Sequence, residues 1–147
     1  MTPRFSEVEF GKIPADWEVI EDDFALLLAM NAPYLSTDVC FAPHANPSDG
    51  LIDLVFIRKT TSSRMFSLFL KDLETGEAVA AHPEIEYRKV RALHLEPLEQ
   101  KGVIMLDGEK VDLRPLQIEA HPQVLPFVCP KELTFPVVPF SGDKKRQ

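Results

Sequence analysis

Long hydrophobic runs are absent from this chain of 147 residues. Even the apolar run Phe24–Met30 has only seven residues, whereas a helix that crosses a membrane needs about 20. The first residues, MTPRFSEVEF, contain no apolar core of the signal-peptide type. We therefore expect no membrane span and no secretion, and we predict a cytoplasmic protein that contacts membranes only transiently, at their periphery.

Cysteine and basic residues are also scarce. The two cysteines, Cys40 and Cys129, are too few for a zinc site, and the four histidines show no ligand spacing. We expect both thiols to be reduced and buried. The formal net charge of -7 argues against binding of nucleic acids, which are polyanions.

Motifs for covalent catalysis and for phosphate binding are missing. The sequence contains no G-x-S-x-G nucleophile motif, no G-x-x-x-x-G-K-[ST] loop and no G-x-G-x-x-G loop. Neighbouring carboxylates such as Asp22 and Asp23 are typical of solvated surface, because adjacency in sequence does not make a catalytic pair. We therefore predict no catalytic residue within this chain.

The residues that are present indicate a mainly β domain. Thirteen prolines against six glycines favour strand ends and loops over a helical bundle. We expect one domain over 15–136, after a leader or linker at 1–14 and before a polar tail at 137–147. The predicted strands are Phe24–Met30 (buried on both faces), Asp38–Phe41, Leu51–Arg58, Ile85–Arg88 and Val90–Leu95.

One segment, from about Ser62 to Glu74, has the period of an α-helix. Its apolar residues recur on a single helical face: Met65, Phe66, Phe69, Leu70 and Leu73. Ser62 or Ser63 can cap its first turn, and Gly76 can end it in the left-handed conformation. The apolar face either covers one side of a sheet or forms the wall of an apolar ligand pocket.

The stretch Gly102–Pro122 predicts three antiparallel strands. Asp107-Gly108 joins two strand-like runs and is typical of a type I′ hairpin turn, in which both central residues have positive φ. Leu116–His121 alternates apolar with polar residues and would complete a β-meander. Glu109 follows the turn. It is either a solvated turn residue or a carboxylate that reaches a metal–phosphate complex, beside the open backbone of Gly108.

Six segments carry a family resemblance by their order and spacing. They are IPADW…DDFALLLAM, APH…SDGLIDLVFIR, SSRMFSLFL…ETGE, ALHLEP, GVIMLDGE and PLQIEAHP. Together, over Ile13–Pro130, they resemble the C-terminal half of the sphingosine kinases, which belong to the diacylglycerol-kinase-like lipid kinases. The resemblance implies an antiparallel β-sandwich that binds a sphingoid base in an apolar tunnel. It also implies an N-terminal domain with a GGDG loop, with ATP and Mg²⁺ between the two domains.

The resemblance assigns roles to residues of this chain. Asp107, Gly108 and Glu109 would contact the nucleotide side of the site, and Glu109 would meet the metal only as part of Mg-ATP. The positions that would line the lipid tunnel are Leu26, Leu28, Leu35, Val55, Phe66, Phe69, Leu70, Leu73 and Ile85. Burial of each methylene group contributes about 0.8 kcal/mol, so an apolar tunnel can hold a long alkyl chain.

The same resemblance implies that the chain acts with a partner. The sequence lacks the family's GGDG loop, its upstream aspartate and its phosphate-contacting arginines. We therefore expect no kinase activity from the chain alone. Its expected partners are a sphingoid-base lipid, the N-terminal kinase domain and, transiently, a membrane. Exposed strand edges and tunnel residues would also favour a homodimer.

Three other interpretations remain open at this point. The chain could be a stand-alone lipid-binding or regulatory module, or part of a kinase that acts on diacylglycerol or ceramide. It could also be an interaction module without a ligand, in which the helix face is fully buried. Glu109 at the turn favours a kinase over a lipid carrier, and the SDGLIDLVFIR and ETGE segments favour sphingoid bases.

Overall fold

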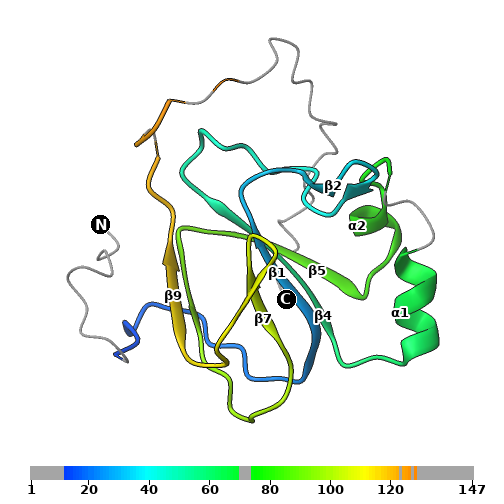
Figure 1. Ribbon diagram of the computed structural model, residues 1–147, viewed down its shortest axis with the longest axis horizontal. Helices are drawn as coiled ribbons and strands as arrows, with labels where there is room; N and C mark the ends of the chain where they lie inside the picture. The colour runs from blue at the N-terminus through cyan, green and yellow to red at the C-terminus, as the bar shows by residue number, and fades with distance from the viewer. Residues whose placement is uncertain (1–11, 70–73, 123, 127, 129–147) are drawn as a thin grey trace, which may run out of the picture.

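A three-stranded antiparallel sheet lies at the centre of the described structure (Figure 1). The computed structural model describes residues 12–69, 74–122, 124–126 and 128. The sheet consists of β1 (Phe24–Met30), β4 (Ile52–Arg58) and β5 (Ile85–Val90), in the order β1-β4-β5. The central strand, β4, is rich in β-branched and aromatic residues and is buried along most of its length, so its prediction is confirmed.

The register of this sheet divides its side chains between two faces. One face, called here the inner face, carries three rows of residues paired across the strands. The rows are Leu26–Ile57–Ile85, Leu28–Val55–Tyr87 and Met30–Asp53–Lys89. The prediction that β1 is buried on both faces is wrong. Ala29 points to the other side and is exposed, and Ala25, at an irregularity of the pairing, is exposed as well, because β1 is the edge strand.

The hydrophobic core is built on the inner face. Its buried members are Phe41, Ala42, Ala45, Val55, Ile57, Ala78, Ile85 and Tyr87. A short hairpin of β2 (Tyr34–Ser36) and β3 (Val39–Cys40) leads into segment 41–45, and β3 lies within the predicted strand at 38–41. Ala78 begins α2 (Ala78–Ala81), a short helix that the sequence did not predict. Segment 41–45 and α2 therefore cover the inner face.

Gly76 lets two loops pack closely beside this core. Its φ of +74° lies in the left-handed region, as predicted. A Cβ atom on Gly76 would lie 2.9 Å from Pro43 Cβ and 3.0 Å from Cys40 Sγ, so a larger residue would push the loops apart. Cys40 is a buried free thiol, as predicted, and burial raises its pKa. Cys129 lies outside the described residues.

The predicted helix begins where expected, as α1 (Ser62–Phe69). Its cap is Thr61 rather than Ser62 or Ser63, since the Arg64 amide donates a hydrogen bond to Thr61 Oγ1 at 3.3 Å. Arg64 is the third helical residue, and an N-cap side chain can accept a hydrogen bond from the backbone amide at this position. Residues 70–73, where the second half of the helix was expected, lie outside the described residues.

Two further strand pairs complete the described structure. They are β6 (Ala92–Leu95) with β9 (Leu116–Glu119), and β7 (Ile104–Leu106) with β8 (Glu109–Val111). The hairpin β7–β8 is confirmed, but the predicted meander is wrong, because β9 pairs with β6 instead of β8. This register places Ile118 opposite Leu93 and Leu116 opposite Leu95, so apolar side chains meet across the pair.

The mainly β, antiparallel fold expected from the sequence is confirmed. Figure 1 shows both described helices grouped at one side of the central sheet and β9 at the other. Within the described ranges, neither helix is long and apolar enough to cross a membrane. The inner face and the hairpin β7–β8 are therefore the two candidate functional surfaces of the described structure.

Candidate functional site

Four of the predicted lipid-contacting residues meet on the inner face. Leu26 and Leu28 lie on β1, and Val55 of β4 is the register partner of Leu28. Ile85 of β5 lies opposite Ile57, on the far side of β4. Val55 and Ile85 belong to the buried core cluster, and the two leucines pack against it. These four residues therefore form one apolar surface.

Access to this surface is greatest at β1. Val55 and Ile85 are buried beneath the segments that cover the inner face. Both leucines of β1 are half-buried, and so are Met30, the next inner-face residue of β1, and Met65 of α1. A ligand that approached this surface would meet the β1 side chains first and the β4 side chains last.

The remaining predicted lipid-contacting residues are not gathered there. Leu35 lies on β2 and is 56% exposed. Phe66 and Phe69 belong to α1. Leu70 and Leu73 lie outside the described residues. The structure thus collects the strand positions into one surface and separates Leu35 from them.

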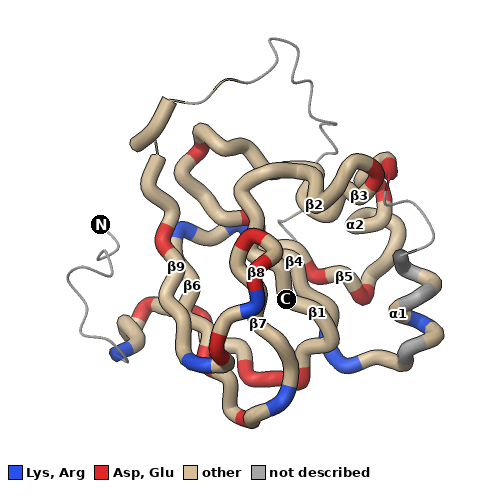
Figure 2. The backbone as a smooth tube through the Cα atoms, in the orientation of Figure 1, with Lys and Arg blue, Asp and Glu red and all other residues tan. Residues whose placement is uncertain are grey.

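The tip of the hairpin β7–β8 carries the predicted nucleotide-side residues. Asp107 has a φ of 48° and Gly108 a φ of 88°, as the predicted type I′ turn requires. Asp107, Gly108 and Glu109 are all exposed, and no atom lies within 4 Å of a Cβ placed on Gly108. Figure 2 shows acidic and basic positions alternating along β8 below this tip. The backbone at the tip is therefore open to close approach by a ligand.

Apolar side chains flank this acidic tip. Val103 is 62% exposed, Met105 59% and Leu106 47%. A hairpin that served only as a solvated turn would not need three large apolar residues on its surface, whereas a contact surface would. In the described part of the chain, no group of three or more histidine, cysteine or acidic residues could hold a metal ion.

A buried polar network lies next to the apolar surface, and the sequence analysis did not predict it. Asp53, on the third row of the inner face, is 0% exposed and accepts a hydrogen bond from the Tyr87 hydroxyl. Lys89 Nζ lies 3.1 Å from Asp53 Oδ1 and 2.8 Å from Asp49 Oδ2. The His44 ring meets the Tyr87 ring edge to face, with 5.2 Å between centroids. A charged residue inside the apolar run LIDLVFI was the available signal.

The surroundings of this network shift three pKa values. Burial, followed by the hydrogen bond to Asp53, raises the pKa of Tyr87 far above its usual range. Burial lowers the pKa of Lys89, but its bonds to Asp49 and Asp53 outweigh that effect, so the net shift is upward. Burial lowers the pKa of His44. At neutral pH the network therefore keeps a protonated Tyr87 and a charged Lys89.

Comparison with known proteins matches this architecture to a described domain. Residues 4–129 match the family "YegS C-terminal NAD kinase beta sandwich-like domain". The chain belongs to this family. The β-sandwich expected from the sequence is the architecture that the family name describes, and the small antiparallel sheets of the described structure agree with it.

The similar full-length proteins are lipid kinases by name. The chain is 38% identical over 113 residues to human sphingosine kinase 2, covering 76% of this chain and 17% of that protein. It is 34% identical over 116 residues to sphingoid long chain base kinase 5 of Saccharomyces cerevisiae (76% and 17%). It is 31% identical over 119 residues to mouse sphingosine kinase 1 (80% and 31%). The predicted resemblance is confirmed, and the chain spans less than a third of each relative.

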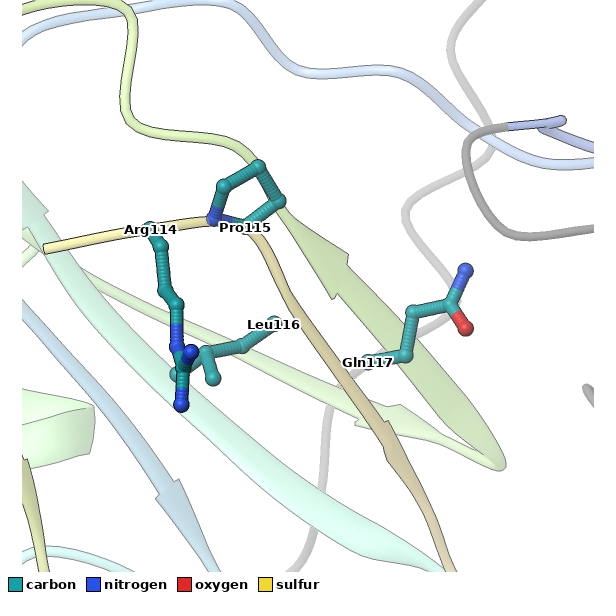
Figure 3. A pocket seen from close by; sticks show the side chains of 4 residues that line it. All are labelled: Arg114, Pro115, Leu116 and Gln117. Atoms are coloured by element: carbon teal, nitrogen blue, oxygen red, sulfur yellow. The ribbon is translucent and has the colours of Figure 1, made fainter. Parts of the chain in front are cut away.

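A surface hollow of this YegS-type domain lies where β9 begins. It has a volume of about 620 Å³ and is lined by Arg114, Pro115, Leu116 and Gln117. Figure 3 shows Arg114 and Leu116 close together on one side of the chain, with Gln117 on the other. No pattern in the sequence singled out these residues. Their hollow is open to solvent, and none of its lining residues belongs to the central sheet.

Ion pairs fix the end of β4 that leads to α1. The Arg58 guanidinium binds both Asp22 and Glu86, and it lies 5.8 Å from the Phe56 ring centroid. Lys59 Nζ lies 3.1 Å from Asp23 Oδ2. These contacts join β5 and the segment before β1 to β4, so the domain holds the three strands of the inner face at both ends.

Proposed function

We propose that this domain is the lipid-binding part of a sphingosine-kinase-like enzyme, which transfers a phosphoryl group from ATP to a sphingoid base. The observation that carries the proposal is the half-buried pair Leu26 and Leu28, which opens onto the apolar inner face. The names of the similar proteins, sphingosine kinases and a sphingoid long chain base kinase, support the choice of lipid.

The inner face suits the alkyl chain of such a lipid. A chain laid against β1 contacts Leu26 and Leu28, with Val55 and Ile85 behind them. Each methylene group that leaves water contributes about 0.8 kcal/mol, so several contacts together offset the cost of extracting the lipid from a membrane. Transient contact with a membrane surface is part of this proposal, because the lipid has to be collected there.

The hairpin tip suits one side of a nucleotide site. Asp107 and Glu109 offer exposed carboxylates, and Gly108 offers an open backbone. Two carboxylates do not make a metal site alone, so the tip fits Mg-ATP that another domain holds. Mg-ATP supplies the phosphoryl group and neutralises its charge. The role of Glu109 is to position the complex, and the flanking apolar side chains contact the N-terminal kinase domain.

Because the nucleotide is held by another domain, the chain alone is inactive as a kinase. Phosphoryl transfer depends on positioning and charge neutralisation by metal and cationic groups, and these 147 residues contain no GGDG loop to provide them. The exposed hairpin residues, when not covered by that domain, favour a homodimer through the same surface.

A binding measurement tests the lipid part. Fluorescent sphingosine should bind the 147-residue chain, and Leu28→Asp should weaken binding at least tenfold, because a carboxylate beside the alkyl chain must be desolvated. Leu98→Asp is the matched control, since Leu98 is exposed and belongs to none of the strands that form the inner face. Circular dichroism establishes that both variants fold. Equal binding by folded Leu28→Asp and the control would contradict the proposal.

An activity measurement tests the nucleotide part. The chain alone should not phosphorylate sphingosine, whereas the chain joined to the GGDG-containing N-terminal domain of a relative should do so. Glu109→Ala in the joined protein should lower kcat/KM at least tenfold, with Glu99→Ala, an exposed acid outside the hairpin tip, as control. Activity of the isolated chain above its own Glu109→Ala variant would overturn this part.

A further inference from the structure

We infer that the buried Asp53 and its half-buried partner Lys89 end the apolar inner face and thereby limit the length of the alkyl chain that this domain accepts. The inference rests on the proposed function, since it concerns the same lipid-binding surface. It makes Asp53 and Lys89 specificity-determining residues.

The row geometry of the sheet defines the limit. The first two rows, Leu26–Ile57–Ile85 and Leu28–Val55–Tyr87, are apolar apart from the Tyr87 hydroxyl. The third row, Met30–Asp53–Lys89, contains two charges. Rows on one face are two residues apart, or about 7 Å along a strand, so the apolar length from the first row to the third is about 14 Å. A chain that runs along β1 therefore reaches Met30 of the third row, where Asp53 is the neighbouring residue on β4.

The charges of the third row are fully engaged and cannot give way to an alkyl chain. Asp53 accepts from the Tyr87 hydroxyl and from Lys89, and Lys89 also binds Asp49. A methylene group at this place would offer no hydrogen bond, and separating a buried charge from its partner is costly. Tyr87 connects the apolar rows to the charged row, because its ring belongs to the second row while its hydroxyl donates a hydrogen bond to Asp53.

The same residues close this end of the surface from outside. Lys89 ties Asp49, in the loop at 43–50, to β4 and β5. Ala45 of this loop is buried in the core cluster, and His44 packs edge to face on Tyr87. The loop is supported in turn by Pro122, which a Cβ on Gly50 would approach to 3.0 Å. The inner face thus has an accessible side at β1 and a blind end at the charged row.

The test replaces the charged pair by apolar residues of similar size. The double variant Asp53→Leu/Lys89→Met adds one apolar row, and such replacements of buried ion pairs are often neutral or stabilising. Binding is measured for a homologous series of saturated sphingoid bases, from shorter to longer than sphingosine, with the wild-type and variant 147-residue chains. Wild-type affinity should rise with chain length and then stop rising. In the double variant the rise should continue, with affinity for the longest base about tenfold above wild type.

A matched control removes an ion pair between the same two strands on the opposite face. Arg58→Met/Glu86→Leu does so, and it should leave the length profile unchanged. If the double variant does not fold, Asp53→Asn/Lys89→Met keeps an acceptor for Tyr87, removes both charges and should shift the profile in the same direction by a smaller amount. An unchanged profile in a folded variant would overturn the length limit and leave the proposed function intact. Failure of the wild-type chain to bind any base of the series would overturn both.

Discussion

The central sheet and the hairpin β7–β8 use apolar residues in opposite ways. In the sheet, Val55 and Ile57 of β4 are almost completely buried, and segment 41–45 and α2 cover them. In the hairpin, Met105 and Leu106 face solvent although they are as hydrophobic as the core. The domain therefore has one region with a closed hydrophobic core and a second region in which uncovered apolar groups form a contact surface.

The largest effect is expected from truncating the core. Ile57→Ala should destabilise the domain by about 3 kcal/mol, because Ile57 is 1% exposed and its loss leaves a cavity. Met105→Ala, a comparable truncation in the hairpin, should change the free energy of unfolding by less than about 0.5 kcal/mol. Urea denaturation measures both. Similar losses would show that the hairpin is packed in solution and would remove the contrast.

Two glycines in turns give the next comparison. Gly76→Ala should cost about 2 to 3 kcal/mol, because its φ is positive and its new Cβ would press on Pro43 and Cys40. Gly108→Ala has the same backbone strain but open space around it, so it should cost about 1 to 2 kcal/mol. Thermal unfolding distinguishes them. A larger loss for Gly108→Ala than for Gly76→Ala would mean that an atom of the folded domain occupies the space at the hairpin tip.

Replacing an aspartate by asparagine should affect the buried and the exposed region differently. Asp53→Asn keeps an acceptor for Tyr87 but leaves Lys89 less well compensated, and should cost about 1 to 2 kcal/mol. Asp107→Asn makes the same chemical change in the exposed turn, where Asn tolerates positive φ, and should be neutral within about 0.5 kcal/mol. Chemical denaturation at neutral pH is the measurement. Equal effects would contradict a buried role for Asp53.

Acidification gives the smallest effect and concerns the far end of the sheet. The hydrogen bond from Arg58 to Asp22 lowers the pKa of Asp22 from 3.8. The pKa of Glu84 is lowered from 4.5 by hydrogen bonds from the Glu84 backbone amide and from Arg64. An acid whose pKa is lower in the folded than in the unfolded state stabilises the fold at pH values above its unfolded-state pKa. This stabilisation is lost as the pH falls through its folded-state pKa. The free energy of unfolding should therefore decrease below about pH 4.5.

Arg58→Met should make this acid dependence shallower, because it removes the partner of Asp22. Lys59→Met removes the more exposed pair with Asp23 and serves as control, since exposed pairs contribute little. Denaturation at several pH values between neutral and acid compares the slopes. Identical slopes for wild type and Arg58→Met would disprove a stabilising role of the Asp22 contact.

Local patterns in the sequence predicted those elements whose structure depends on residues close together in the chain. The Asp107-Gly108 turn, the strand β4 and the start of α1 follow from backbone preferences and from the spacing of apolar residues. Four of the positions carried over from the family, Leu26, Leu28, Val55 and Ile85, lie on one surface in the structure, and their contact with a lipid stays a prediction.

Pairing between distant segments was not predictable in the same way. Alternation in Leu116–His121 fits any antiparallel neighbour, so it did not reveal that β9 pairs with β6. The Asp53 network joins residues of three segments, and a single acid within an apolar strand does not identify its partners. The four alanine-rich residues of α2 are too few to show a helical period.

The contact of Gly50 with Pro122 has a consequence for the order of folding. The hairpin β7–β8 closes through two turn residues and can form within microseconds. The pairing of β6 with β9 closes a much longer loop, and only after β9 has docked can Pro122 reach Gly50. The loop at 43–50, which shuts the blind end of the inner face, therefore gains its last support late, after the strands beneath it are in place.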